Sequence, residues 1–250
     1  MKKFKKLIPA LCMLLISAVL MGTSTYAWFS MNTTVTANGM EVKAKSESEF
    51  LQIINQDGTF SDSEAQATAT AKTATNTIKP VVAVKEISTS KETITELDDT
   101  ITADAIKWAE AFSADPNSST KATNYQEIQN TSINDYTLLN TFKVRMNPKT
   151  GVNTSKTPLK VSSVTVEGNK DQLKAAVSVL FVCGDNFVLW KNDKVIVTKV
   201  AGNVLATNVT TESTEIKVYI FFDGEDPVTT TNNATAVGTD GYNVEFTLSI

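Results

Sequence analysis

Histidine is absent from the 250-residue sequence. Its absence excludes catalytic triads and dyads that use histidine as the base, zinc sites of the HExxH type, and copper or iron sites with imidazole ligands. Carboxylate chemistry and metal ions held by oxygen ligands are not excluded. Any enzymatic hypothesis is therefore limited to acidic residues.

Cysteine is almost absent as well, with two residues in the whole chain. Cys12 lies inside an apolar run near the N-terminus, and the bulky Leu11 before it argues against a lipoprotein site. Cys183 is then alone and has no partner for an intrachain disulfide, so the fold must depend on its apolar core. Because Cys183 ends the apolar run 177–182, we expect a buried small hydrophobe rather than a reactive thiol.

The first 27 residues predict a secretory signal peptide. Four lysines precede the apolar run Leu7–Met21, and the small residue Ala27 stands at a cleavable position with Thr25 two positions before it. The run is shorter than the roughly 20 residues that a membrane-spanning helix needs. We therefore expect cleavage after Ala27 and a secreted mature chain that begins at Trp28. A retained membrane anchor is the alternative.

Removal of this leader sets the size and charge of the mature chain. The remaining 223 residues are enough for one large all-β domain or two small ones. The leader carries four lysines and no acidic residue, so its loss takes the formal net charge from −4 to −8. An acidic surface repels phosphate backbones, and we expect no nucleic-acid partner.

One segment of the mature chain has helical spacing. Ile106 and Ala109 are three residues apart, Trp108 and Phe112 are four apart, and Asp115 with the residues after it ends the pattern. Apolar residues at these intervals share one face of a helix. The sequence therefore predicts one short helix that ends with Phe112.

The rest of the mature chain has the short alternating patterns of β-strands, separated by turn signals. Residues 61–77 consist of Ala, Thr and Ser with almost no large apolar side chain, which predicts a mobile surface loop. Many strands and one helix favour an antiparallel β-sandwich over alternating βα units. We therefore predict an all-β fold, a single jelly-roll-like domain over 28–250 with long loops. The predicted strands are 33–37, 40–44, 50–54, 78–84, 136–146, 159–166, 175–182, 187–190, 195–200, 215–222 and 242–250.

The residues around the expected cleavage site resemble those of a known family. Thr25–Ser30, followed by Val35–Val42 with a turn at Asn38-Gly39, is similar to the N-terminal segment of the TasA/camelysin family of Gram-positive bacteria. There a signal ending in T-Y-A or T-W-A is cut by a dedicated SipW-type signal peptidase. The resemblance extends to segments within 136–145, 161–166, 218–226 and the closing strand.

The resemblance implies a jelly-roll subunit of extracellular biofilm-matrix fibres. In that family the freed N-terminal strand of one subunit fills a groove in the next. The implied partners are other copies of the chain, the SipW-type peptidase, and other matrix proteins or polysaccharide. Camelysin-like members carry a metallopeptidase label, which the absence of histidine does not support in this chain.

The N-terminal segment of the mature chain also has the composition of a strand that adds to another sheet. Its first 13 residues carry no charged side chain, and they include Trp28, Phe29, Met31 and Val35. In strand addition, main-chain hydrogen bonds give affinity and alternate side chains fill pockets. We therefore expect an exchange strand over 28–45 with these four side chains as assembly contacts. Pairing within the same subunit is the alternative.

Acidic side chains follow the apolar strand 215–222. Asp223, Glu225 and Asp226 offer the oxygen ligands that calcium prefers, although their spacing matches no EF-hand loop. The sequence therefore predicts calcium as the one candidate cofactor, with a solvated hairpin turn as the alternative.

Two further features leave other functions open. Glu96, Asp98 and Asp99 form a second acidic loop, and paired carboxylates can hydrolyse glycosides. Trp190 ends a predicted strand, where it is expected in the core, or in contact with carbohydrate if exposed. The main hypothesis is a secreted, non-enzymatic fibre subunit of the extracellular matrix or cell surface. The alternatives are a surface adhesion or glycan-binding module and a secreted metal-dependent hydrolase.

Overall fold

The computed structural model of the protein describes residues 35–36, 41–46, 51–54, 69–70, 77–112, 122, 124–147, 158–168, 174–226, 229 and 242–250. These residues are mostly β-strand, with two short 3₁₀ helices, η1 (Ala103–Ala105) and η2 (Asn130–Asp135). Within these ranges no helix is long and apolar enough to cross a lipid bilayer. The all-β prediction is confirmed.

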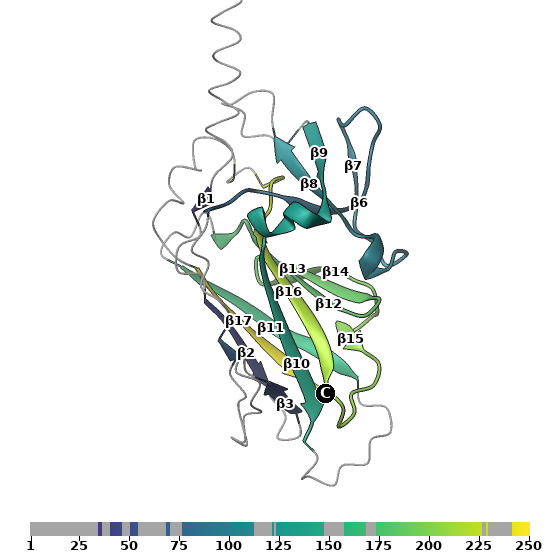
Figure 1. Cartoon of the computed structure of the whole chain (residues 1–250), viewed down its shortest axis with the longest axis vertical. Helices are drawn as coiled ribbons and strands as arrows, with labels where there is room; N and C mark the ends of the chain where they lie inside the picture. The colour runs from purple at the N-terminus through teal and green to yellow at the C-terminus, as the bar shows by residue number, and fades with distance from the viewer. Residues whose placement is uncertain are drawn as a thin grey trace, which may run out of the picture.

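Two large sheets form a sandwich (Figure 1). In spatial order, the six-stranded sheet consists of β14 (Lys194–Thr198), β13 (Asn186–Lys191), β12 (Val177–Cys183), β16 (Thr214–Phe222), β10 (Leu138–Met146) and β3 (Leu51–Ile54). The five-stranded sheet consists of β15 (Val204–Ala206), β11 (Leu159–Gly168), β17 (Tyr242–Ser249), β2 (Glu41–Ser46) and β4 (Ala69–Thr70). Strands that follow one another in the chain repeatedly change sheets, as in a jelly roll.

Aromatic side chains fill the space between these two sheets. Phe246 at the centre of β17 is fully buried and meets Phe142 and Phe181 of the opposite sheet edge-on, at centroid distances of 5.4 and 5.0 Å. Strict alternation along β17 places every second side chain in this core, as the sequence predicts. Burial of apolar surface of this kind is the main stabilising term of the fold.

The five-stranded sheet contains one parallel pair. β2 runs beside β17 in the same direction, with registers from Glu41 opposite Asn243 to Ser46 opposite Leu248. Parallel neighbours cannot be joined by a tight turn, and these two strands come from opposite ends of the described chain. The antiparallel prediction is correct for the other strand pairs of the sandwich.

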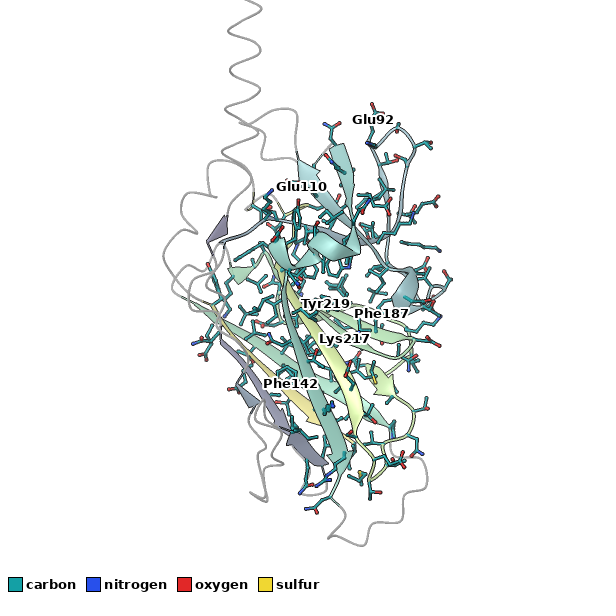
Figure 2. The ribbon with its side chains drawn as sticks, in the orientation of Figure 1. Glu92, Glu110, Phe142, Phe187, Lys217 and Tyr219 are labelled. Atoms are coloured by element: carbon teal, nitrogen blue, oxygen red, sulfur yellow. The ribbon has the colours of Figure 1, made fainter. Side chains whose placement is uncertain are left out.

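A third layer covers the outer face of the six-stranded sheet (Figure 1). It is an antiparallel sheet in the order β7 (Ile94–Glu96), β6 (Val82–Ile87), β8 (Lys107–Phe112) and β9 (Asn124–Ile128). Trp108 of β8 packs edge-on against Phe221 at 5.2 Å and contacts Tyr219 at 5.4 Å. Figure 2 labels Tyr219 and Phe187, which belong to the apolar cluster between the six-stranded sheet and the third layer. It also labels Phe142, which belongs to the core of the sandwich. The predicted strand 78–84 overlaps β6, but the sequence did not predict a separate third sheet.

The prediction of a helix that ends with Phe112 is therefore wrong. Residues 107–112 form β8, paired with β6 and β9, and only η1 before it is helical. Both faces of this sheet carry buried side chains, with Trp108 on one face and Ala109 on the other. A strand that is buried on both faces has apolar residues at odd and at even positions, so it lacks the simple alternation of a strand buried on one face. Its apolar residues can then fall at the intervals typical of a helix.

Tight turns join β12, β13 and β14. The predicted strands 175–182 and 187–190 pair as the hairpin β12–β13, and Gly184 in its turn has φ 56°. Asn192 and Asp193 in the next turn have φ 52° and 58°, as in a type I′ turn.

Two short strands lie near or within the predicted loop 61–77. Ala69–Thr70 forms β4 and pairs with β2, and β5 (Thr77–Ile78) pairs with β1 (Val35–Thr36). The other residues of this loop lie outside the described ranges, so its predicted mobility stays a prediction.

Candidate functional site

β16 ends in the acidic turn that the sequence pointed to. Asp223 forms an isolated parallel β-bridge with Val81, at the start of the third layer. The backbone N of Gly224 donates a hydrogen bond to the Val81 carbonyl oxygen at 3.2 Å. A Cβ at position 224 would lie 2.9 Å from the Cβ of Ala111. The turn therefore joins the sandwich to the four-stranded sheet, and this close approach requires glycine.

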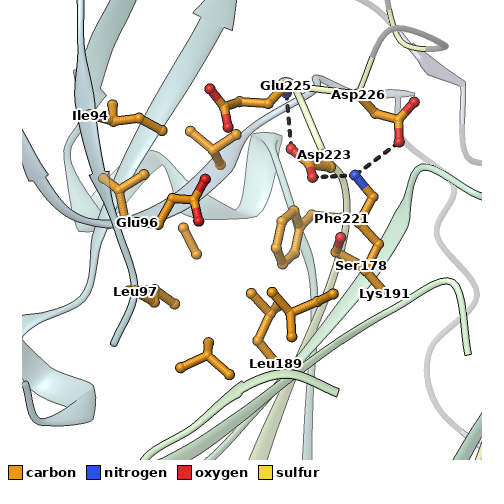
Figure 3. Close-up of a pocket in the computed structure, with 15 residues that line it drawn as sticks. Ile94, Glu96, Leu97, Ser178, Leu189, Lys191, Phe221, Asp223, Glu225 and Asp226 are labelled. Carbon is orange, nitrogen blue, oxygen red and sulfur yellow. Dashed lines mark hydrogen bonds and ion pairs between the residues drawn. The ribbon is translucent and has the colours of Figure 1, made fainter. Parts of the chain in front are cut away.

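Lys191, the last residue of β13, binds two carboxylates of this turn (Figure 3). Its Nζ lies 2.6 Å from Oδ2 of Asp223 and 2.9 Å from Oδ2 of Asp226. The three side chains are 22%, 19% and 14% exposed. Burial alone would lower the pKa of Lys191, but the two carboxylates outweigh it and the pKa is raised. At neutral pH, Lys191 is therefore a charged link between the hairpin β13–β14 and the turn.

Glu225 of the same turn is bound by the four-stranded sheet. Tyr125 of β9 donates its hydroxyl hydrogen to Oε1 of Glu225 at 2.5 Å. Burial, followed by this hydrogen bond and the charge of Glu225, raises the pKa of Tyr125. The phenol therefore stays protonated and holds the turn against β9.

The calcium prediction named Asp223, Glu225 and Asp226, and the structure places all three in one turn. However, the ammonium group of Lys191 bridges two of these carboxylates. Among the described residues, no cluster of three or more Asp, Glu, Cys or His side chains is arranged to hold a metal ion. Calcium stays a prediction that these contacts do not support.

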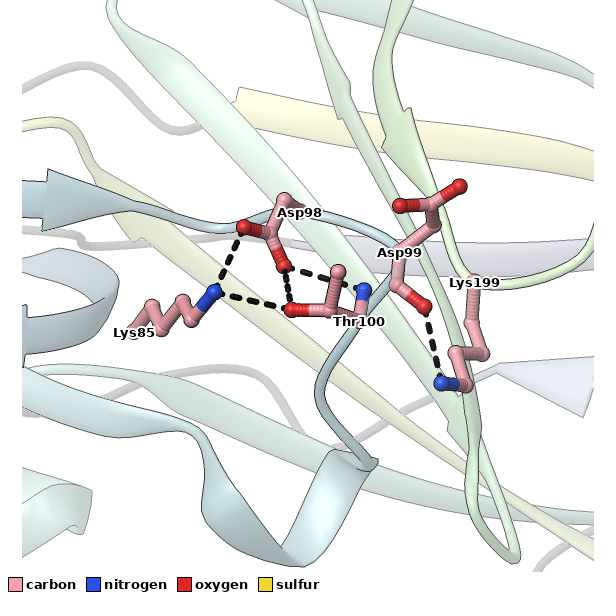
Figure 4. A network of polar contacts seen from close by, with 5 residues as sticks. All are labelled: Lys85, Asp98, Asp99, Thr100 and Lys199. Carbon is pink, nitrogen blue, oxygen red and sulfur yellow. Dashed lines mark hydrogen bonds and ion pairs between the residues drawn. The ribbon is translucent and has the colours of Figure 1, made fainter.

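The second acidic loop connects β7 to η1 (Figure 4). Lys85 Nζ pairs with Asp98 Oδ2 at 2.7 Å, and Thr100 donates to Oδ1 from its backbone N at 2.9 Å and from its hydroxyl. The bond from Lys85 and those from Thr100 lower the pKa of Asp98 to about 2. The carbonyl oxygen of Asp99 accepts a hydrogen bond from Lys199 Nζ at 2.8 Å. These contacts give Asp98 a structural role in fixing the loop.

A cleft of about 400 Å³ separates the four-stranded sheet from strands β13 and β14 (Figure 3). The Lys191 network lies at one end, and Glu96 of β7 points its carboxylate between the two walls. Ile196 of β14 also lines it; at 55% exposure, it is the one exposed large apolar side chain in the part of the chain that the structure describes. The main apolar lining residues are Val82, Val84, Leu97, Leu189, Val197 and Phe221.

A second cavity, of about 470 Å³, lies against the same face of the six-stranded sheet. Trp108 and Tyr219 contribute aromatic side chains to it, and Asp104, Asn134 and Lys217 contribute polar ones. Trp108 is only 6% exposed, and burial raises the pKa of Tyr219. A larger share of its lining surface is polar than in the first cavity.

Most of the predicted cleavage and assembly residues fall outside the described ranges. This holds for Thr25, Ala27, Trp28, Phe29 and Met31. Val35 is the exception: it lies in β1 and faces Ile78 of β5 in the register of that pair. The last part of the predicted exchange strand, from Glu41 onward, is β2 and pairs with β17.

Two predictions about single side chains are confirmed. Cys183 is free and 7% exposed, and burial raises the pKa of its thiol. Trp190 is 8% exposed and belongs to the sandwich core, so the exposed alternative for Trp190 is wrong.

Sequence reasoning missed Lys191, Tyr125 and Ser178 as neighbours of the acidic turn. Lys191 is 32 residues from Asp223, and no spacing motif joins positions so far apart. The only signal lies in the strand register: Ser178 of β12 is opposite Lys191 on one side and Phe221 on the other. That register follows from the sheet order, which the sequence alone does not give.

The chain was compared with protein-family models, with curated proteins and with solved structures, and none matches. The TasA/camelysin resemblance therefore stays a prediction. The function has to be argued from the residues of this chain and their arrangement.

Proposed function

We propose that the protein is a secreted, non-enzymatic subunit that assembles into extracellular matrix fibres by β-strand addition. The observation that carries this proposal is the position of β2. It is an N-terminal strand, lies parallel to the C-terminal strand β17, and directly follows the uncharged sequence 28–40.

The pairing of β2 is unequal on its two sides. All six of its residues pair with β17, whereas only Lys43 and Ala44 pair with β4. No hairpin connects β2 to β17, so its place in the sheet depends on main-chain hydrogen bonds and on buried contacts such as that of Ala44, which is fully buried. A strand held in this way can be supplied by a second copy of the chain without a change in its contacts.

In an assembled fibre, such an exchange would keep β17 paired on both of its edges. Without a neighbour at the position of β2, the eight residues of β17 would form a sheet edge with unpaired N–H and C=O groups. Either an internal strand or a strand from a neighbour removes that edge. Assembly therefore competes with internal pairing, and the balance depends on protein concentration.

Export is part of the proposal. Cleavage after Ala27 frees the uncharged segment that begins at Trp28, and a SipW-type signal peptidase is the expected enzyme. Other matrix proteins or polysaccharide are the expected neighbours of the fibre, outside the cell or at its surface.

Deletion of Trp28–Ala37, the part of the exchange strand that precedes β2, tests the mechanism and leaves β2 in place to pair with β17 of its own chain. The deleted chain is expected to remain a folded monomer by circular dichroism and sedimentation, and to form no fibres by electron microscopy. The mature chain is expected to polymerise in a concentration-dependent way, and the chain that retains its signal peptide is not. Fibres formed by the deleted chain would contradict strand addition from this segment.

A substitution pair separates this effect from a general effect of charge. Val35→Lys places a charge in the expected assembly strand and is expected to block fibres. Ile196→Lys places the same charge on an apolar side chain that is already 55% exposed, and fibres are expected to form as in the unchanged chain.

Glycan binding is a second candidate function, favoured by the cavity that Trp108 and Tyr219 line together with polar side chains. Sugars are bound by aromatic faces and by hydrogen-bonding groups in such a combination. A monomer that binds a soluble oligosaccharide, and loses binding in Asn134→Ala, would support it. No observation in the described residues favours the metal-dependent hydrolase.

A further inference from the structure

We infer that the cleft between β7 and β14 is a binding site for a small organic amine, a primary ammonium carried on an alkyl or arylalkyl body. This site is separate from the strand β2 on which the proposed fibre function depends. Its evidence is the shape of the cleft, the irregular strands beside it, and its charge.

The shape suits a small ligand with an apolar body. A volume of about 400 Å³ lies within the range of roughly 300–1,000 Å³ that is typical of ligand pockets. Val84 and Leu97 face the cleft from the four-stranded sheet, and Leu189 and Phe221 from the six-stranded sheet. Ile196 exposes more than half of its surface beside this lining, where a bound apolar group would cover it.

The strands on both sides of the cleft are unsuited to strand addition. Val197 pairs with Leu189 and Val195 with Trp190, so Ile196 is an extra, bulged residue of the edge strand β14. On the other side, β7 has three residues, and its pairing with β6 also changes register between Val84 and Glu86. Bulges and short edge strands prevent another strand from pairing. The cleft therefore suits a compact ligand rather than an added strand.

The charge of the lining favours a cation. Four carboxylates line the cleft, from Glu96, Asp223, Glu225 and Asp226, and Lys191 is the only basic residue among its lining residues. Lys191 is already engaged by Asp223 and Asp226. Low-dielectric walls strengthen the attraction between these acidic side chains and an ammonium ion.

The buried hydroxyl of Ser178 is a further feature of the cleft that suits an ammonium group. Ser178 is 2% exposed, lines the cleft, and lies beside Lys191 in Figure 3. A primary ammonium has three donors and a serine hydroxyl can accept one of them. The cleft thus offers both a hydroxyl acceptor and carboxylates to one ammonium group.

Calorimetric titration of the mature chain with 2-phenylethylammonium tests the inference. Its neutral isostere 2-phenylethanol is the matched ligand, and the amine is expected to bind about tenfold more tightly because of its charge. Binding is expected to weaken as the salt concentration rises.

Two variants locate the binding. Glu96→Gln removes one carboxylate from the cleft and is expected to reduce affinity for the amine several-fold, whereas Glu167→Gln makes the same change on the exposed face of β11 and is expected to have no effect. Ile196→Trp is expected to obstruct the cleft and abolish binding, and Ser163→Trp on β11 is its control. Both tryptophans replace exposed side chains, so the fold should be kept.

The inference is overturned if amine and alcohol bind equally, if neither binds, or if Glu96→Gln and Ile196→Trp bind the amine like the unchanged chain. It is also overturned if only a peptide with a free amino end binds, because the occupant would then be a polypeptide. None of these results bears on fibre formation, which electron microscopy measures separately.

Discussion

Replacement of Lys191 by methionine is the sharpest test of the network that joins the sandwich to the third layer. Methionine keeps much of the apolar stem of lysine but leaves the carboxylates of Asp223 and Asp226 without their cation at 2.6 and 2.9 Å. Removal of one partner from a fully buried pair costs about 3–5 kcal/mol. The three side chains keep 14–22% exposure, so water screens part of this cost and we expect a loss of about 2–3 kcal/mol.

Urea unfolding at pH 7, followed by tryptophan fluorescence, measures this loss as a lower midpoint with an unchanged m-value. In a domain of this size the melting temperature should fall by roughly 4–12 °C. Lys85→Met is the matched control, because its pair with Asp98 has a similar distance of 2.7 Å but exposures of 31% and 41%. It should destabilise the protein much less. Equal effects of the two substitutions would refute the role assigned to burial.

The pH dependence of this difference gives a second check. The pKa of Lys191 is raised in the folded chain, so its contribution is complete below the ordinary lysine pKa of about 10.4 and is lost as pH rises through the raised value. The difference in unfolding free energy between the unchanged chain and Lys191→Met should therefore be constant from pH 7 to about 9.5 and shrink only above about pH 10.4. A difference that disappears near pH 8 would show that the lysine charge is not its source.

Three further predictions concern single contacts. Phe246→Ala should cost about 3–5 kcal/mol in urea unfolding, because it leaves a cavity between Phe142 and Phe181; a loss below 1 kcal/mol would mean that the core is not packed as described. Gly224→Ala should destabilise by about 1–3 kcal/mol through its contact with the Cβ of Ala111, and Ala111→Gly in the same chain should restore most of this; no rescue would place the strain elsewhere. Burial and the nearby Glu110 raise the pKa of Tyr136 to about 12, so Tyr136 should ionise late in an absorbance titration at high pH. The pKa values of Tyr125 and Tyr219 are raised as well, so Tyr136→Phe should reduce the late absorbance change by one tyrosine and should not abolish it.

The sequence was sufficient wherever a strand is buried on one face. β17 alternates strictly between core and surface, and its limits were predicted to within one residue. The two strands of the hairpin β12–β13 were predicted as 175–182 and 187–190, and they are joined by Gly184, whose positive φ suits glycine. In these elements each local preference agrees with the tertiary arrangement, so local patterns are enough.

In the third layer, local sequence patterns do not agree with the tertiary arrangement. β8 has buried side chains on both faces, and its apolar residues therefore gave a helical period. β7 is only three residues long, which is too short to show a detectable alternation of apolar and polar residues. The same holds for β15 of the five-stranded sheet. The register between distant strands, which decides what surrounds Lys191, depends on the sheet order and not on any local signal.

The two proposals occupy opposite sides of the six-stranded sheet, and this arrangement makes them separable. β2 lies in the five-stranded sheet, which faces the six-stranded sheet through the core around Phe246. The cleft lies against the other face, between Leu189 and Phe221 on one wall and Val84 on the other. Strand exchange at β2 leaves every residue of that cleft unchanged. The amine should therefore bind with one stoichiometry and affinity to the mature chain in fibres and to the monomer that lacks Trp28–Ala37. A loss of binding in fibres alone would mean that fibre contacts, and not only exchange at β2, cover the third layer.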